Sequence, residues 1–228
     1  MNKGYFFSLL LSALLFGCSS TGNTPDKDTI VTGSVSDQAS RIYWLDTIKD
    51  APSRLTEKTT LGREGHYDAD YRWRAGVLRE VILQGSVRDG DKMLPMSVHI
   101  RYDTNERAVY QKYRLNGSVL PLRKAELVKY AREANFSLES AKAASKAGIR
   151  FFQGYWSDGE LTECDTDKTK TLKFMPSFPR FVKQRLEMED NFIAAVGSVG
   201  NTSNLVSGII ALDTDSADCI ERPEPEAD

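Results

Sequence analysis

The stretch that decides the fold is VLREVILQGSVRDGDKMLPMSVHIRYD, residues 77–103. Polar and apolar residues alternate along both of its halves, which is the pattern of strands with one buried face. Asp89-Gly90 separates the halves, and this pair tolerates the positive φ angles of a tight hairpin turn. We therefore predict two antiparallel strands, at 77–88 and 92–103. One face of the second strand is apolar and belongs to a core: Met96, Val98, Ile100 and Tyr102.

Similar strands are predicted on both sides of this hairpin. Residues 107–115 follow it, and Asn116-Gly117 then turns the chain into a short strand at 118–122. Upstream, residues 30–36 and 41–46 form a weaker pair of strands. The first half of the chain is therefore predicted to be an antiparallel β-meander.

A helical segment follows at 122–148, where Ala, Glu, Lys and Leu dominate and apolar residues recur at helical spacing. We predict two helices here, interrupted at Asn135. Ser137 would cap the start of the second helix and Gly148 would end it. The helices either cover one face of the meander or join two domains.

Short strands return after the helical segment and surround one more short helix. The strands are predicted at 149–156, 160–165, 170–175, 191–199 and 205–213, with the helix opened by Pro179 before the fourth. Three strands, a helix and two strands is the order of an OB-type barrel. The predicted fold class is thus α+β and mostly β: an antiparallel β-meander with a helical segment, followed by a small OB-like barrel.

The two ends of the chain differ in composition from its body. Residues 5–16 are apolar, but this stretch is shorter than the roughly 20 residues that cross a bilayer, so it indicates a secretion signal. The end of the chain is acidic and contains prolines. The predicted divisions are a signal peptide at 1–17, a tether at 18–28, the meander with its helical segment at 29–148, the OB-like domain at 149–220 and an acidic disordered tail at 221–228.

Leu15-Phe16-Gly17-Cys18 resembles the lipobox of bacterial lipoproteins. That resemblance implies that Cys18 is acylated and anchors the chain in a membrane. Ser19 after the cysteine implies, by the sorting rule of these proteins, the periplasmic side of the outer membrane. With 30 Lys and Arg against 32 Asp and Glu, the chain has no general attraction for nucleic acid, and we expect no such partner.

Cys164 and Cys219 remain as thiols once Cys18 is acylated. In an oxidising compartment two such cysteines favour a disulfide. A metal site and a reactive thiol are the alternatives, but there is no Cys-x-x-Cys and neither histidine is near a cysteine in the sequence.

Two looser resemblances concern larger parts of the chain. In length, and in having a lipobox before a strand-rich body, the chain resembles the uncharacterised YjaH-type lipoproteins of enteric bacteria and vibrios. Residues 149–213, with Gly154-Tyr155-Trp156 and a Cys after the second strand, are similar to the small barrel of NlpE-type envelope lipoproteins. The metal-associated Cys-x-x-Cys of some NlpE-type proteins has no counterpart here.

Few residues of the sequence indicate a catalytic, metal-binding or cofactor-binding site. His66 lies in a loop-like stretch and His99 on the polar face of a strand, without the motifs of hydrolases or phosphate-binding loops. We predict no catalytic residue, no metal site and no cofactor.

The candidate ligand-binding residues are Arg72, Arg74 and Trp156. The two arginines would share a strand face and match a phosphate or carboxylate; alternatively they are solvated or paired with Glu64 and Asp68. Trp156 belongs to an aromatic strand that would either stack on a ligand or fill the core.

The expected function is a binding or interaction module of the periplasm, anchored in the outer membrane through Cys18, with an envelope protein or glycan as partner. The alternative is a structural or envelope-stress accessory that binds another envelope protein. A cell-envelope enzyme is the third hypothesis.

Overall fold

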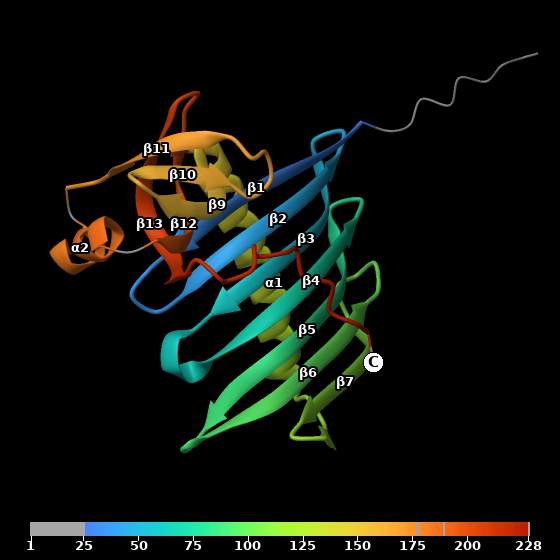
Figure 1. Ribbon diagram of the computed structural model, residues 1–228. Coiled ribbons are helices and arrows are strands. Elements are labelled where there is room, and N and C mark those ends of the chain that lie inside the picture. The colour runs from blue at the N-terminus through green and yellow to red at the C-terminus, as the bar shows by residue number, and fades with distance from the viewer. Residues whose placement is uncertain (1–25, 177, 189, 228) are drawn as a thin grey trace, which may run out of the picture.

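The structure is a computed structural model that describes residues 26–176, 178–188 and 190–227 (Figure 1). The predicted signal peptide, most of the tether and Cys18 lie outside the described residues. Eight strands form one antiparallel sheet in chain order: β1 (Lys27–Val35), β2 (Ser40–Ile48), β3 (Ala51–Thr60), β4 (Gly65–Arg74), β5 (Val77–Asp89), β6 (Lys92–Tyr102), β7 (Ala108–Leu115) and β8 (Ser118–Leu120). The predicted meander is confirmed.

The central hairpin is also confirmed, with its turn displaced by one residue. Asp89 still pairs with Lys92, so the turn residues are Gly90 and Asp91, and Gly90 has a φ of 59°. Strand β3 was not predicted from the sequence, and of β4, which follows it after a short 3₁₀ helix (Gly62–Glu64), only a strand around Arg72 and Arg74 was considered. Their polar residues obscure the alternation because one sheet face carries a network of charges.

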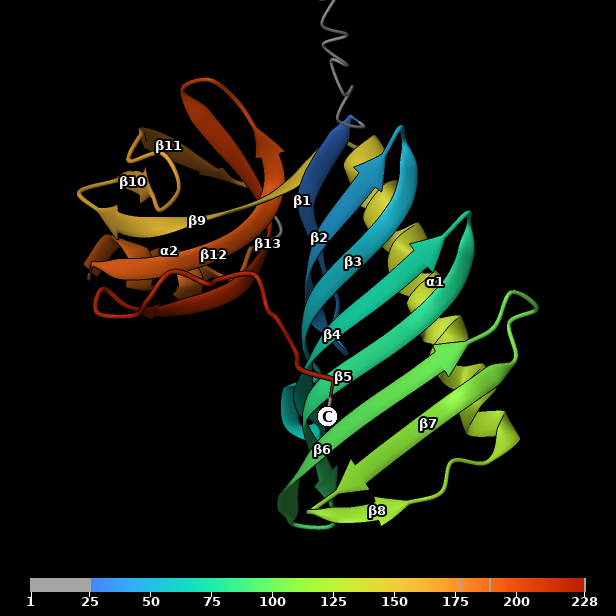
Figure 2. The ribbon, with the colours of Figure 1, turned by 90° about the vertical axis from the view of Figure 1, so that its right-hand side faces the viewer.

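One helix, α1 (Lys124–Lys146), replaces the two predicted helices. The predicted interruption is wrong because Asn135 points to solvent and leaves the helix intact. Ser137 is likewise no cap: it is buried inside the helix, facing the sheet. Figure 2 shows α1 along one face of the sheet, which we call the helix face. The core between them includes Leu45, Leu55, Tyr71, Trp73, Val81, Val98, Ile100, Ala134, Leu138 and Ala141.

A buried carboxyl group lies in this core. Glu57 of β3 is fully buried, accepts a hydrogen bond from Thr59 and lies 3.3 Å from Nε of Arg41. Burial raises the pKa of Glu57 above its ordinary value, and hydrogen bonds from Ser137 and Thr59 and the charge of Arg41 offset this only in part. The folded state therefore holds the Glu57 proton more tightly than the unfolded chain does.

Glu57→Gln is expected to flatten the pH dependence of stability. A raised folded-state pKa gives a contribution that is complete below the unfolded pKa of about 4.3 and is lost as pH rises through the folded pKa. Urea unfolding at several pH values should show wild-type stability falling relative to Glu57→Gln as the pH rises above the unfolded pKa and through the raised folded pKa. Exposed Glu160→Gln is the control. Parallel curves for wild type and Glu57→Gln would contradict the shift.

The second unit is a closed five-stranded barrel: β9 (Ile149–Ser157), β10 (Glu160–Glu163), β11 (Thr169–Phe174), β12 (Asn191–Val199) and β13 (Ser203–Thr214). Helix α2 (Arg180–Met188) connects the third strand to the fourth. All pairings are antiparallel except that of β11 with β13. This closure, with the fifth strand between the third and fourth, confirms the predicted OB-like barrel. Among the described residues, no helix is long and apolar enough to cross a membrane.

The C-terminal segment, residues 217–227, joins the two units. It leaves the barrel and runs over the sheet face opposite α1, which we call the outer face (Figures 1 and 2). Arg222 donates to both carboxylate oxygens of Asp46, at 2.9 and 2.7 Å, and to Thr56 at 2.8 Å. Pro223 and Pro225 are buried. The prediction of a disordered tail is therefore wrong for this part, because the single basic residue among its acids has a carboxylate partner on the sheet.

Candidate anion-binding site

Four arginines surround one depression of about 440 Å³ at an end of the outer face. Strand β4 contributes two of them, and β5 and β6 contribute one each. They are Arg72, Arg74, Arg79 and Arg101. Both arginines predicted as ligand-binding residues thus line the same depression, together with two that are distant in sequence.

Two of the four guanidinium groups are neutralised by carboxylates. Arg72 pairs with Asp70 at 2.8 Å and with Glu80 at 3.0 Å, and Arg101 pairs with Glu80 at 3.0 Å. The pKa of Arg72 is raised, and the hydrogen bond from Arg72 to Asp70 is the largest cause. The predicted partners Glu64 and Asp68 are thus replaced by Asp70 and Glu80, because the register places Glu80 opposite both Arg72 and Arg101.

The other two guanidinium groups have no acidic partner in the described part of the chain. Arg79 donates only to the backbone carbonyl of Tyr102, at 3.0 Å. Arg74 is exposed and makes no ion pair or hydrogen bond with any described residue. The depression therefore has two uncompensated positive charges, on groups that match carboxylate and phosphate oxygens bidentately.

Glu80 orients two of the four arginines of this site through ion pairs. It accepts hydrogen bonds from Nε2 of His99 at 2.8 Å and from Arg101 at 3.0 Å. Burial alone would raise the pKa of Glu80, but these hydrogen bonds and the charge of Arg72 outweigh it and lower the pKa below its ordinary value. Glu80 is therefore ionised at neutral pH and holds Arg72 and Arg101 in place, which leaves Arg74 and Arg79 for a ligand.

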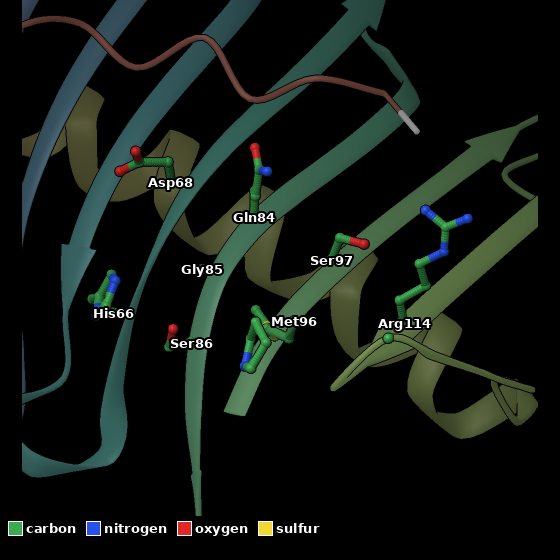
Figure 3. Close-up of a pocket in the computed structure, with 10 residues that line it drawn as sticks. His66, Asp68, Gln84, Gly85, Ser86, Met96, Ser97 and Arg114 are labelled. Atoms are coloured by element: carbon green, nitrogen blue, oxygen red, sulfur yellow. The ribbon is translucent and has the colours of Figure 1, made fainter. Parts of the chain in front are cut away.

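The two histidines are not brought together. His66 lines a second, polar depression of about 430 Å³, whereas His99 is buried against Glu80. Figure 3 shows His66, Asp68, Gln84 and Ser86 on neighbouring strands of the outer face. Asp68 pairs with Lys58 at 3.3 Å.

Trp156, the third predicted ligand-binding residue, does not lie on a binding surface. The residue is 9% exposed and packs in the core of the barrel, and its indole Nε1 donates to the Leu186 carbonyl at 2.7 Å. The prediction of a stacking platform at Trp156 is wrong, because this side of β9 faces the barrel core. The alternative, an aromatic residue that fills the core, agrees with the structure.

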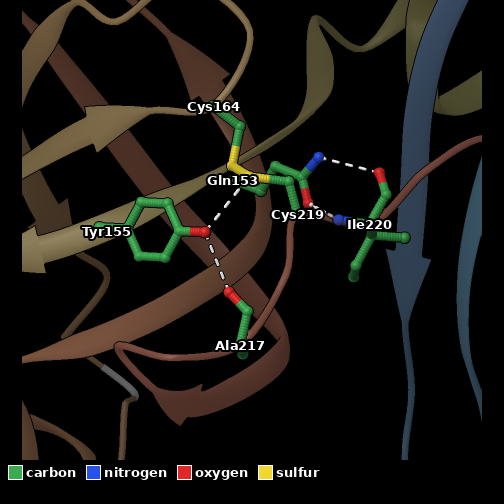
Figure 4. Close-up of a disulfide and its surroundings, with 6 residues drawn as sticks. All are labelled: Gln153, Tyr155, Cys164, Ala217, Cys219 and Ile220. Carbon is green, nitrogen blue, oxygen red and sulfur yellow. Dashed lines mark hydrogen bonds between the residues drawn. A yellow bond between two sulfur atoms is a disulfide. The ribbon is translucent and has the colours of Figure 1, made fainter.

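The predicted disulfide is present. Cys164 and Cys219 are bonded, with 6.3 Å between their Cα atoms (Figure 4). Beside them, Gln153 exchanges two hydrogen bonds with the backbone of Ile220, at 2.9 and 2.7 Å. Tyr155 donates to the Ala217 carbonyl at 3.0 Å. The disulfide therefore fastens the start of the C-terminal segment to the end of β10, and the hydrogen bonds of Gln153 and Tyr155 fasten it to β9.

Comparison with known proteins gives one result. The model of a family described as a protein of unknown function, DUF1481, matches residues 31–224. The chain belongs to the DUF1481 family. The DUF1481 match spans the barrel, the four arginines, both disulfide cysteines and all of the eight-stranded sheet except the first four residues of β1. No curated protein and no solved structure matches the chain, so the resemblances to YjaH-type and NlpE-type lipoproteins stay predictions.

Proposed function

We propose that this protein is an outer-membrane-anchored periplasmic lipoprotein that acts as a binding module, and that the arginine-lined depression binds an anionic group of an envelope partner. The anchor is Cys18, on the strength of its lipobox. The ligand group is a phosphate or carboxylate, as found on lipopolysaccharide, on peptidoglycan or on another protein.

A single observation carries this proposal: Arg74 and Arg79 face one depression without acidic partners in the described chain. A guanidinium group that served only to stabilise the sheet would be expected to pair with a carboxylate, as Arg72 and Arg101 do. Strand positions also hold the arginines more rigidly than loop positions would, which lowers the entropy lost on binding.

The experiment is a titration of the folded chain with two defined probes. Lipid A micelles supply phosphate groups, and a soluble muropeptide supplies carboxylates. We expect saturable binding of one probe, weakened at least tenfold in Arg74→Gln/Arg79→Gln and weakened by added salt. Calorimetry measures both effects.

The matched control is Arg63→Gln/Arg88→Gln, which removes two arginines that do not line this depression. It should bind like wild type. Equal loss in both double variants would show only nonspecific attraction, and no binding of either probe would reject the proposed site.

A further inference from the structure

The last long strand of the sheet has a free edge. Strand β8 pairs with residues 113–115 of β7 alone. Within the part of the chain that the structure describes, no strand pairs with residues 108–112 of β7 on the side away from β6. Unpaired backbone N–H and C=O groups along an edge are a template for another extended chain.

Apolar side chains gather beside this edge. Val109 is 66% exposed and Val119 63%, and Tyr110 and Leu120 are exposed as well. Successive strand residues point to opposite faces of a sheet, so these side chains flank the edge on both faces, where an added strand would cover them. A sheet that simply ended at β7 would not need the groove that lies beside this edge.

That groove, of about 440 Å³, runs between the β6–β7 turn and the first half of α1. Its apolar lining comes from Ala108 at one end of the free edge and from three residues of α1: Leu127, Val128 and Ala131. A strand added to β7 points alternate side chains to the two sheet faces, so every second side chain would lie toward the helix face and this groove.

The charges around the edge identify the occupant. Lys112, Lys124 and Arg132 have no ion-pair partner among the described residues, whereas Glu106 is the one acid lining the groove. A second copy of the chain would bring this basic surface against itself. An acidic segment would not meet that repulsion.

We infer that the β7 edge and the adjoining groove bind an extended peptide segment of a partner protein, in which apolar residues alternate with acidic ones. The peptide adds a ninth strand to the sheet, and main-chain hydrogen bonds supply most of its affinity. The groove shares only Tyr102 with the lining of the arginine depression, while Val109, beside the edge, also lines that depression. The peptide surface therefore adjoins the arginine depression but does not include Arg74 or Arg79.

The test selects decapeptides from a random phage-displayed library against the full folded chain. Enriched peptides are synthesised, and their affinity is measured by fluorescence anisotropy. We expect sequences that alternate apolar and acidic residues, and we expect the bound peptide to slow hydrogen exchange at the amides of residues 108–112.

Val128→Glu is the decisive variant, because it places a negative charge in the groove, where it would repel an acidic peptide. Glutamate is a good helix former, so the substitution should leave α1 intact. It should weaken peptide binding at least tenfold. Val199→Glu, at a comparably exposed valine of the barrel, is the matched control and should leave binding unchanged. Failure to enrich any peptide, equal affinity for both variants, or exchange protection confined to other strands would each overturn the inference. None of these outcomes bears on lipid A or muropeptide binding, which tests different residues.

Discussion

Replacing both disulfide cysteines, in Cys164→Ser/Cys219→Ser, is expected to lower the free energy of unfolding by about 4 kcal/mol. The bond links residues 55 apart in the sequence, so its loss restores the chain entropy of a long loop in the unfolded state. Urea unfolding followed by tryptophan fluorescence measures the difference, with the reduced wild type as a second reference.

Arg222→Gln serves as the control for this experiment. It removes the ion pair with Asp46 but keeps the disulfide, and a partly exposed pair contributes about 1 kcal/mol or less. If the cysteine variant lost no more stability than Arg222→Gln, the C-terminal segment would be held by its ion pair and not by the disulfide.

Trp156→Ala is expected to destabilise the barrel by about 3–5 kcal/mol. The substitution empties a large volume next to Phe174 and leaves the Leu186 carbonyl of α2 without its indole donor. Chemical unfolding measures the stability, and the lipid A and muropeptide titrations measure binding. Trp156→Phe keeps most of the volume and should lose less.

Binding of either probe should stay within about twofold of wild type in Trp156→Ala under conditions where the barrel is folded. If Trp156→Ala kept the stability of wild type but no longer bound either probe, Trp156 would be a ligand-binding residue after all.

The predictable part of the fold depended on local signals. Alternation around Asp89-Gly90 located the central hairpin, and the order of short elements after residue 149 located the barrel. Strand β3 was not predicted because Thr56 and Glu57 are polar yet buried, and the buried Asp70 likewise obscures the pattern of β4. Their burial depends in part on partners from other strands, Arg41 for Glu57 and Arg54 for Asp70. Nothing in the local sequence identifies Arg41 and Arg54 as those partners.

The candidate site was also predictable only where local sequence patterns determine it. Arg72 and Arg74 were recognisable from their alternation with aromatic residues, and Tyr71 and Trp73 do lie in the core. Arg101 had a signal too, because it lies on the polar face of its strand. Its position opposite Glu80 required the hairpin register, which the displaced turn had left open.

The way strands are paired also bears on how the chain acquires its structure. In the eight-stranded sheet every hydrogen-bonded neighbour is also the next strand along the chain. Contacts of such low sequence separation cost little loop-closure entropy, so the sheet can assemble hairpin by hairpin. The barrel cannot, since β9 must wait for β12, whose Asn191 pairs with Trp156. Cys219 follows all of these strands, so the disulfide can form only after every strand of both units has been synthesised.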